Sequence, residues 1–306
     1  MTDKQKARLA VILANFFFGT SVIAVKHITP SLVPAIGLTA IRVVCTTILL
    51  WLMFAFRPVK MGIAAKDYRR LFFCAIFGIT LNQTFAIRGM SLASPIHAAL
   101  LILTTPIVVT LLAAWVLKES LNSQKILGLA LGISGGALLV FSRDLSAAAA
   151  GDQTLGDLFV ILGALSYSTY MVSIRPIVGK YNAMHILQWV FLFGSFFSLP
   201  LGWTAISNVQ WSALDGVSWF CLVYVVLGAT FFAYQFMNYG IAKLGASVTG
   251  SFMYTQPFFA TTASMLILHE SLNWTKIAAA FLIMCGVFLT NYKKKFPEPV
   301  SDTPEP

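Results

Sequence analysis

Polar side chains that could bind a small solute interrupt some of the most apolar stretches of the sequence. Asn82 and Gln83 lie in one stretch, and Tyr234 and Asn238 lie four residues apart, hence on one helix face, in another. Amides and a phenol offer hydrogen-bond donors and acceptors without a charge. At a shared depth they would line a polar cavity, and the alternative is that they hydrogen-bond one helix to the next.

Arg42 places a full charge inside an apolar run. A charge near the centre of a membrane costs at least about 2.5–3.5 kcal/mol on insertion scales, so this side chain must face protein or water. We expect no Asp or Glu within the apolar runs to pair with it. Arg42 therefore either meets a substrate carboxylate or binds backbone carbonyls of a neighbouring helix, and the structural role is the one we favour.

Two prolines follow polar side chains inside apolar runs. Thr104 and Thr105 precede Pro106, and Gln256 precedes Pro257. Proline removes a backbone donor and leaves a carbonyl without its partner, which in lipid requires another partner or a water-lined space. We expect kinks or hinges at both prolines, with Gln256 as a substrate contact, and kinks without any ligand role are the alternative.

The candidate substrate-binding set extends to residues in two further runs. Most aromatic side chains of such a chain simply pack or face lipid, but Phe18, Tyr167 and Tyr170 fall at depths where a pore would pass. The full set is Asn15, Phe18, Asn82, Gln83, Thr104, Thr105, Tyr167, Tyr170, Tyr234, Asn238 and Gln256.

Two acids at the ends of apolar runs have a structural interpretation. Glu119 and Glu270 each stand just before a new run, where a carboxylate meets the positive end of the next helix dipole. Proton carriage by either acid is the alternative. Without a carboxylate inside the membrane a proton relay lacks its parts, and His97 is the one histidine that we would test.

An internal repeat positions all of these residues. The stretch from Thr104 to Leu138 matches the stretch from Thr255 to Leu289 at an offset of 151, with 13 identities over 35 positions and no gap. The same offset sets Gln83 opposite Tyr234. A repeat of this length indicates two similar structural units.

Composition places the repeat in a membrane. The chain is 58% hydrophobic and 10% charged, with a mean hydropathy of +0.80, whereas soluble domains carry about 25% charged residues. About 20 apolar residues are needed for a helix that crosses a bilayer. Ten runs qualify, at 7–26, 32–56, 71–88, 95–117, 122–142, 156–175, 183–206, 217–239, 246–268 and 273–292.

Lysine and arginine predict the orientation. With the N-terminus in the cytoplasm, 16 of them lie on the inner side and 4 on the outer side. The net charge of +10 then reflects topology rather than nucleic-acid binding. Each half contains an odd number of helices, so the second repeat is inverted. We expect repeats at 1–142 and 156–292, a linker at 143–155 and a disordered cytoplasmic tail at 293–306.

These features resemble the EamA-type ten-helix exporters of the drug/metabolite transporter superfamily. Each half closes with proline, Glu-Ser-Leu, isoleucine and glycine at one spacing, at 106–135 and 257–286. Residues 15–21, Asn-Phe-Phe-Phe-Gly-Thr-Ser, are similar to the family's Trp-Gly-Ser stretch with Phe18 in place of tryptophan, and Arg42 matches an arginine common in the second helix. The resemblance implies small-molecule transport, generally outward, and supports a cavity lined by helices 1, 3, 4, 6, 8 and 9.

The sequence therefore predicts an all-α integral membrane protein, with ten transmembrane helices in two inverted five-helix repeats. We expect a secondary transporter of amino acids or other zwitterionic or aromatic metabolites, working by alternating access. No nucleotide-binding, metal-binding or catalytic motif is recognisable, so we expect neither an enzyme nor a cofactor or metal. The expected partners are the substrate and the bilayer, without nucleic acid.

Several alternatives stay open from the sequence. The protein could import or exchange phosphorylated sugars or nucleotide-type metabolites, or act as a scaffold that moves no solute. Gly128, Gly132 and Gly136 permit close helix packing either within one chain or between two copies, so a monomer and a homodimer are both compatible. The expected location is a bacterial inner membrane with both termini in the cytoplasm.

Overall fold

The computed structural model describes residues 2–29, 31–56, 62–116, 118, 123–141, 150–174, 176–177, 180–244, 249 and 252–291. Over these ranges the elements are helices and no β-strand occurs. The first part comprises α1 (Asp3–Ile28), α2 (Ala35–Phe56), α3 (Ala65–Ala75), η1 (Ile76–Leu81), α4 (Asn82–Leu92), α5 (Pro95–Ile102), α6 (Thr105–Val116) and α7 (Ser123–Phe141). The second comprises α8 (Ala150–Ile174), α9 (Ala183–Ser207), η2 (Trp211–Ala213), α10 (Gly216–Val223), η3 (Tyr224–Phe232), α11 (Ala233–Leu244), η4 (Phe252–Thr255), α13 (Gln256–Ile267) and α14 (Trp274–Asn291).

Seven helical segments of the described chain are long and apolar enough to cross a membrane. They are Asp3–Ile28, Ala35–Phe56, Ala65–Leu92, Pro95–Val116, Gln153–Ile174, Met184–Ser207 and Gly216–Gly240, and Trp274–Leu289 is a shorter apolar helix. The prediction of an all-α membrane protein is confirmed at this level. Local signals start the helices: Thr2 and Gln5 form a capping box at α1, and Ser94 caps α5 ahead of Pro95.

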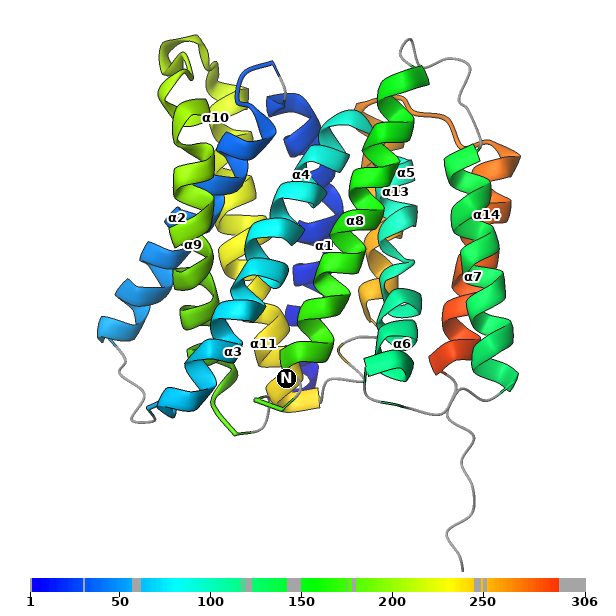
Figure 1. Ribbon diagram of the computed structural model, residues 1–306. Coiled ribbons are helices and arrows are strands. Elements are labelled where there is room, and N and C mark those ends of the chain that lie inside the picture. Colours follow the sequence, from blue (N-terminus) through cyan, green and yellow to red (C-terminus); the bar gives the residue numbers. More distant parts are fainter. Residues whose placement is uncertain are drawn as a thin grey trace, which may run out of the picture.

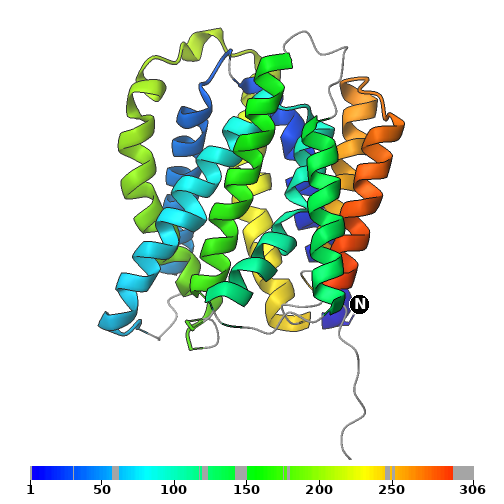
Figure 2. The same ribbon diagram turned by 45° about the vertical axis from the view of Figure 1, so that its right-hand side comes forward.

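The helices stand roughly parallel in one bundle (Figure 1). Helix α1, behind α4 and α8 in this view, packs against α11 and α13, while α2 packs along α9 at one side. Helices α7 and α14 pack along each other at the opposite side, which Figure 2 shows from a second direction. Large apolar side chains cover the outside: Phe56 is 84% exposed, and Trp115 and Trp274 are 79% and 85% exposed near helix ends. Tryptophans at such positions are typical membrane-interface anchors.

Irregular backbone recurs at positions related by the repeat offset. The π-helical segments η1 and η3 cover residues 76–81 and 224–232, which overlap when shifted by 151. Within the described residues, positive φ outside glycine occurs at Lys118 (54°) and His269 (53°), which are also 151 apart. Two parts of the chain with only partial sequence identity therefore share unusual local geometry.

Helices α7 and α14 meet through glycines that leave no room for a side chain. A Cβ on Gly286 would lie 2.5 Å from both the Gly128 oxygen and the Gly132 nitrogen, and one on Gly135 would lie 2.8 Å from Ile283 Cγ1. In the repeat, Gly132 corresponds to Ile283 and Gly135 corresponds to Gly286. The repeat therefore relates the contact between Gly132 and Gly286 to the contact between Gly135 and Ile283. From one contact to the other the residue number rises in α7 and falls in α14, so the two helices are antiparallel. The GxxxG glycines thus pack two helices of the same chain against each other.

Candidate functional site

A hydrogen bond between repeat-related residues lies inside the bundle. Gln83 Nε2 donates to Tyr234 Oη over 3.0 Å. Gln83 is the second residue of α4, which follows η1, and is 5% exposed, and Tyr234 is the second residue of α11, which follows η3. Phe18 and Phe191 pack edge-on against the Tyr234 ring, at centroid distances of 5.7 and 5.3 Å. The two repeat-related positions therefore touch each other.

Arg42 lies beside this pair and is 6% exposed. Its Nε donates to Thr230 Oγ1 over 2.9 Å, and Thr230 in turn donates to the Val225 carbonyl, which η3 leaves accessible. Arg42 also interacts electrostatically with Tyr234. Among the described residues no carboxylate contacts the guanidinium, so the bundle interior keeps a positive charge that is satisfied only in part.

A second polar contact joins α1 to α13. Gln256 Nε2 donates to Asn15 Oδ1 over 2.9 Å, and Asn15 Nδ2 donates to the Val11 carbonyl over 2.7 Å. Gly19 permits this approach, because a Cβ there would lie 2.6 Å from the Gln256 carbonyl oxygen. Both side chains were expected in the lining, and the structure places them against each other.

The remaining members of the predicted set occupy α4, α6, α8 and α11. Tyr167 and Tyr170 lie 5.6 Å apart between ring centroids, and Tyr170 covers Gly78 of η1. Asn82 Nδ2 donates to the Gly163 carbonyl of α8 over 3.0 Å. Asn238 instead joins α11 to α9, through a contact of 3.6 Å to Met184 Sδ. The set thus forms a polar and aromatic interior of buried and half-buried side chains rather than one connected network.

The two prolines stand directly after breaks in the helices. Pro106 is the second residue of α6, which follows the turn at Leu103 and Thr104, and Pro257 is the second residue of α13, which follows η4. A proline in the first helical turn removes a donor that has no intrahelical partner anyway. The hydroxyls of Thr104 and Thr105 each donate to a carbonyl three residues earlier, over 2.6 Å.

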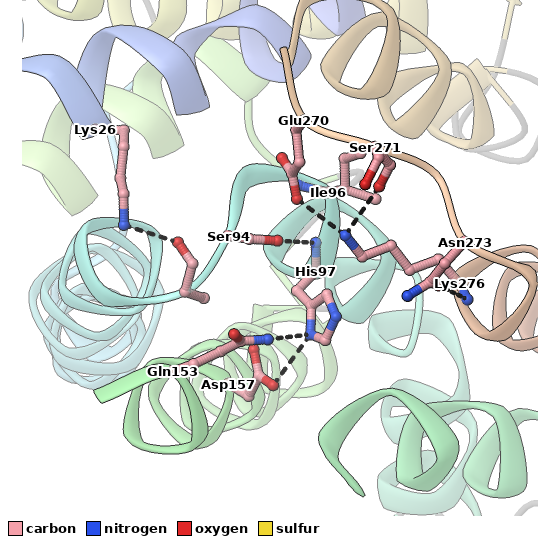
Figure 3. A network of polar contacts seen from close by, with 11 residues as sticks. Lys26, Ser94, Ile96, His97, Gln153, Asp157, Glu270, Ser271, Asn273 and Lys276 are labelled. Carbon is pink, nitrogen blue, oxygen red and sulfur yellow. Dashed lines mark hydrogen bonds and ion pairs between the residues drawn. The ribbon is translucent and has the colours of Figure 1, made fainter. Parts of the chain in front are cut away.

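A dense polar network lies at one end of the bundle (Figure 3). We call the end that contains Lys26, His97 and Glu270 the outer end, and the opposite end, where α1 begins, the inner end. Glu270 accepts the backbone N–H of Ile96 over 3.4 Å and lies 3.3 Å from Lys276 Nζ. The Lys276 ammonium, with a side chain only 2% exposed, also donates to the Ser271 carbonyl. Glu270 was expected to meet the N-terminus of the helix that follows it, but the backbone N–H that it accepts belongs to the start of α5. Glu119 lies outside the described residues.

The same network contains a buried histidine and a buried acid. His97 Nδ1 lies 3.3 Å from Asp157 Oδ2 and 3.1 Å from Gln153 Nε2, which links α5 to α8. The two side chains are 1% and 2% exposed. The expectation of no carboxylate within the apolar runs was wrong: Asp157 belongs to the run at 156–175 and is buried because α5 covers it. Lys26 completes the outer end by donating to the carbonyls of Ser91 and Ala93.

The inner end contains a cavity of about 600 Å³. Its lining comes from α3 and from the inner ends of α6 and α8. The residues are Lys66, Arg69, Arg70, Phe73, Val116, Val172, Ser173 and Pro176. The lining residue Phe73 lies one helical turn before Phe77 and Gly78. Ser166 and Tyr170 of α8 contact Phe77 and Gly78. Within the described residues no cluster of His, Cys, Asp or Glu could hold a metal ion.

Sequence reasoning missed Thr230 as the partner of Arg42 and the contact between His97 and Asp157. Thr230 lies in a π-helical segment, whose side-chain directions no helical periodicity predicts. Asp157 was visible as an acid inside an apolar run, but its partner is 60 residues away in the sequence. The cavity at the inner end was also missed, because its three cations were interpreted as membrane anchors.

Comparisons with known proteins agree with this architecture. The model of the EamA-like transporter family matches the chain twice, over residues 5–141 and 154–292. The chain is 24% identical to the uncharacterized transporter YetK of Bacillus subtilis over 95% of this chain and 88% of that protein. It is 26% identical to the uncharacterized transporter sll0355 of Synechocystis, over 95% and 91%.

More distant relatives extend the comparison. The WAT1-related chloroplastic protein At3g02690 of Arabidopsis thaliana is 24% identical, over 92% of this chain and 69% of its own length. A protein solved by crystallography superposes with a TM-score of 0.61 at 19% identity, over 93% of this chain and 96% of that one. This last likeness concerns the fold alone.

Proposed function

Because the chain belongs to the EamA-like transporter family, we propose that it is a secondary transporter that exports small organic metabolites by alternating access. The family and its relatives are membrane transporters rather than enzymes, so a small-molecule substrate and a lipid environment follow from membership. The finer proposal is ten transmembrane helices in two inverted repeats, at 1–142 and 156–292, joined by the linker at 143–155. Inverted repeats that rock about a central site are a frequent design among such transporters.

One observation supports the repeat, and two more support its inverted arrangement. The π-helical segments and the residues with positive φ recur at an offset of 151. The glycine contacts of α7 and α14 exchange under the same offset and run in opposite directions. Gln83 and Tyr234, which are 151 residues apart, touch each other, as residues next to a two-fold axis do. The excess of lysine and arginine on one side favours cytoplasmic termini and a bacterial inner membrane.

The observation that carries the proposed substrate class is the partly satisfied Arg42 beside the bond between Gln83 and Tyr234. A buried guanidinium without a carboxylate suits the carboxylate of a bound solute. The neighbouring amides suit a polar or ammonium group, and Phe18, Tyr167 and Tyr170 suit an apolar or aromatic part. Amino acids and other zwitterionic or aromatic carboxylates therefore fit the interior best, with the full predicted set as its lining.

The state of the two ends supports a direction. The contacts at the outer end link α1 to α4, and α5 to α8 and α14 through His97 and Glu270, whereas the inner end contains the cavity. A transporter in this state would load its substrate from the cytoplasm, as an exporter does. It would act as a monomer or a homodimer, driven by a gradient of the substrate or of an ion.

A second candidate is an importer or exchanger of phosphorylated metabolites. Lys66, Arg69 and Arg70 favour it, because they place three positive charges at the cavity of the inner end. Competition of transport by hexose phosphates, but not by amino acids, would select this candidate.

The proposal is tested in two steps with purified protein. A thermal-shift screen against amino acids, purines and sugar phosphates identifies ligands, since binding to the folded state raises apparent stability. Counterflow in proteoliposomes then measures transport of each hit by the native protein and by Asn82→Ala, Gln256→Ala and Tyr234→Phe. We expect reduced counterflow in all three variants. Undiminished transport in all three would overturn the site, and a protein that moves no solute would be the scaffold.

A further inference from the structure

Helix α3 presents three basic side chains on one face. Lys66, Arg69, Arg70 and Phe73 are spaced i, i+3, i+4 and i+7, which places them in one row along the helix. All four line the cavity at the inner end. One wall of the cavity is therefore cationic at the mouth and aromatic one turn deeper.

Within the described residues, the facing walls are mostly apolar and contain no acid. Val116 comes from the end of α6, and Val172 and Ser173 come from the end of α8, followed by Pro176. Val172 is 5% exposed, whereas Val116 is 56% exposed and marks the open rim. The cavity thus combines a cationic side with an apolar side, which is the arrangement that an amphipathic anion requires.

The acid nearest in sequence does not neutralise these cations. Asp67 accepts the Tyr181 hydroxyl over 2.7 Å, and the same hydroxyl accepts the Ala64 N–H at the start of α3. The bond to Asp67 raises the pKa of Tyr181, so the phenol stays protonated and continues to donate. Within the described part of the chain, Lys66, Arg69 and Arg70 form no ion pair and no side-chain hydrogen bond. Like charges at i, i+3 and i, i+4 repel each other, and a bound anion would relieve that repulsion.

We propose that this cavity binds the phosphate group of an amphipathic anion, held by Lys66, Arg69 and Arg70 with its apolar part against Phe73 and Val116. Guanidinium groups present paired donors that match phosphate oxygens, and the lysine adds a mobile point charge. The cavity volume of about 600 Å³ falls in the range of small-molecule sites. Basic pockets between helices at the cytoplasmic face are also where anionic lipid headgroups bind.

Two sources offer this chemistry, an anionic phospholipid of the inner leaflet and a soluble phosphorylated metabolite. The lipid source fits the open, apolar rim at Val116, and the soluble source fits the three exposed cations at the mouth of the cavity. The inference rests on the proposed function only for the side of the membrane that the cavity faces. Binding can be measured without transport, so a failure of transport leaves this test intact.

The experiment uses the full chain, purified in detergent and stripped of bound lipid. Affinity is measured by microscale thermophoresis for short-chain phosphatidylglycerol against phosphatidylcholine, and for a hexose phosphate against the parent hexose. The cavity variant is Lys66→Gln/Arg69→Gln/Arg70→Gln. The matched control, Lys4→Gln/Lys6→Gln/Arg8→Gln, removes the same charge from exposed positions at the start of α1. Glutamine is a good helix former, so α3 should persist.

We expect an anionic ligand to bind the native protein, with affinity reduced by more than about tenfold in the cavity variant and little changed in the control. Salt should weaken the binding. Binding of phosphatidylglycerol alone identifies the lipid source, and binding of the hexose phosphate identifies the soluble source. Equal losses in the two variants, or no preference for anionic over uncharged ligands, would overturn the proposal. If the cavity variant does not fold, Arg69→Lys/Arg70→Lys keeps the charge, and it should still bind with reduced affinity.

Discussion

Buried ionisable side chains at the outer end of the bundle contact each other in pairs, whereas the basic side chains around the cavity at the inner end do not, among the described residues. At the outer end Lys276 meets Glu270, and His97 meets Asp157, with exposed fractions of 1–2% for three of these four side chains. At the inner end Lys66 and its neighbours surround open space. A buried charge is tolerated only when it is paired, and the pairing supports our proposal that the outer end is the closed one. The inner end leaves its charges hydrated and open to a ligand.

The largest effect is expected from Lys276→Met. This change leaves Glu270 without its buried cation, and breaking a buried pair in this way costs about 3 kcal/mol or more. The exposed pair of Lys243 with Asp3 at the inner end is the matched control, because its side chains are 45% and 68% exposed. Lys243→Met should change the free energy of unfolding by less than about 1 kcal/mol. Denaturation in mixed micelles measures the free energy of unfolding of both variants. Equal losses of stability would contradict the difference that we describe between the two ends.

The next effect concerns the scaffold that both ends share. Gly135→Ala and Gly286→Ala should each destabilise the protein by about 2 kcal/mol, because the added methyl group overlaps the facing helix. Similar losses would indicate that the two repeats pack symmetrically, so that the difference between the ends comes from the polar side chains. Gly216→Ala is the control, since a Cβ there would meet nothing within 4 Å. An equally large loss of stability in Gly216→Ala would contradict the explanation that the added methyl group overlaps a facing helix.

A smaller effect is expected between the two ends, at the hydrogen bond of Gln83 with Tyr234. Tyr234→Phe removes the acceptor, and a double-mutant cycle with Gln83→Leu should give a coupling of about 1 kcal/mol in unfolding free energy. The pair lies where the repeats meet, so both single variants should also slow counterflow. A coupling near zero would mean that the two side chains do not interact in the folded protein.

The smallest effect concerns an exposed acid at the outer end. Ser218 donates to Asp215 from its side chain and its backbone, which lowers the pKa of that carboxyl and caps α10. A lowered pKa adds stability above the unfolded value of about 3.9, and that stability is lost as the pH falls below it. Asp215→Asn should cap α10 equally well, and this variant should not lose that stability at acidic pH. Melting curves of both proteins between neutral and acidic pH measure it, and identical acid sensitivity would contradict the assignment.

The sequence predicted the repeat and the membrane class, because internal identity and hydrophobic length can be read directly from the chain. The substrate-binding roles of the candidate side chains stay predictions. The sequence did not predict how those side chains pair. Arg42 was expected near backbone carbonyls, but its partner is the Thr230 hydroxyl, which the π-helix turns inward. Asp157 was overlooked because its burial depends on α5, which lies elsewhere in the sequence. The expectations for 143–149 and 293–306, like that for Glu119, lie outside the described residues.

The most direct test of the account is the accessibility of each end in sealed membranes. Ala93→Cys and Ser173→Cys are introduced separately into a protein whose four native cysteines are replaced, and a membrane-impermeant maleimide is applied from either side. Ala93 is buried at the outer end, and Ser173 lines the cavity at the inner end. The account predicts rapid labelling at position 173 from the cytoplasmic side and protection at position 93, with the protection lost when Lys276→Met is added. Rapid labelling at position 93 from outside, together with protection at position 173, would contradict it.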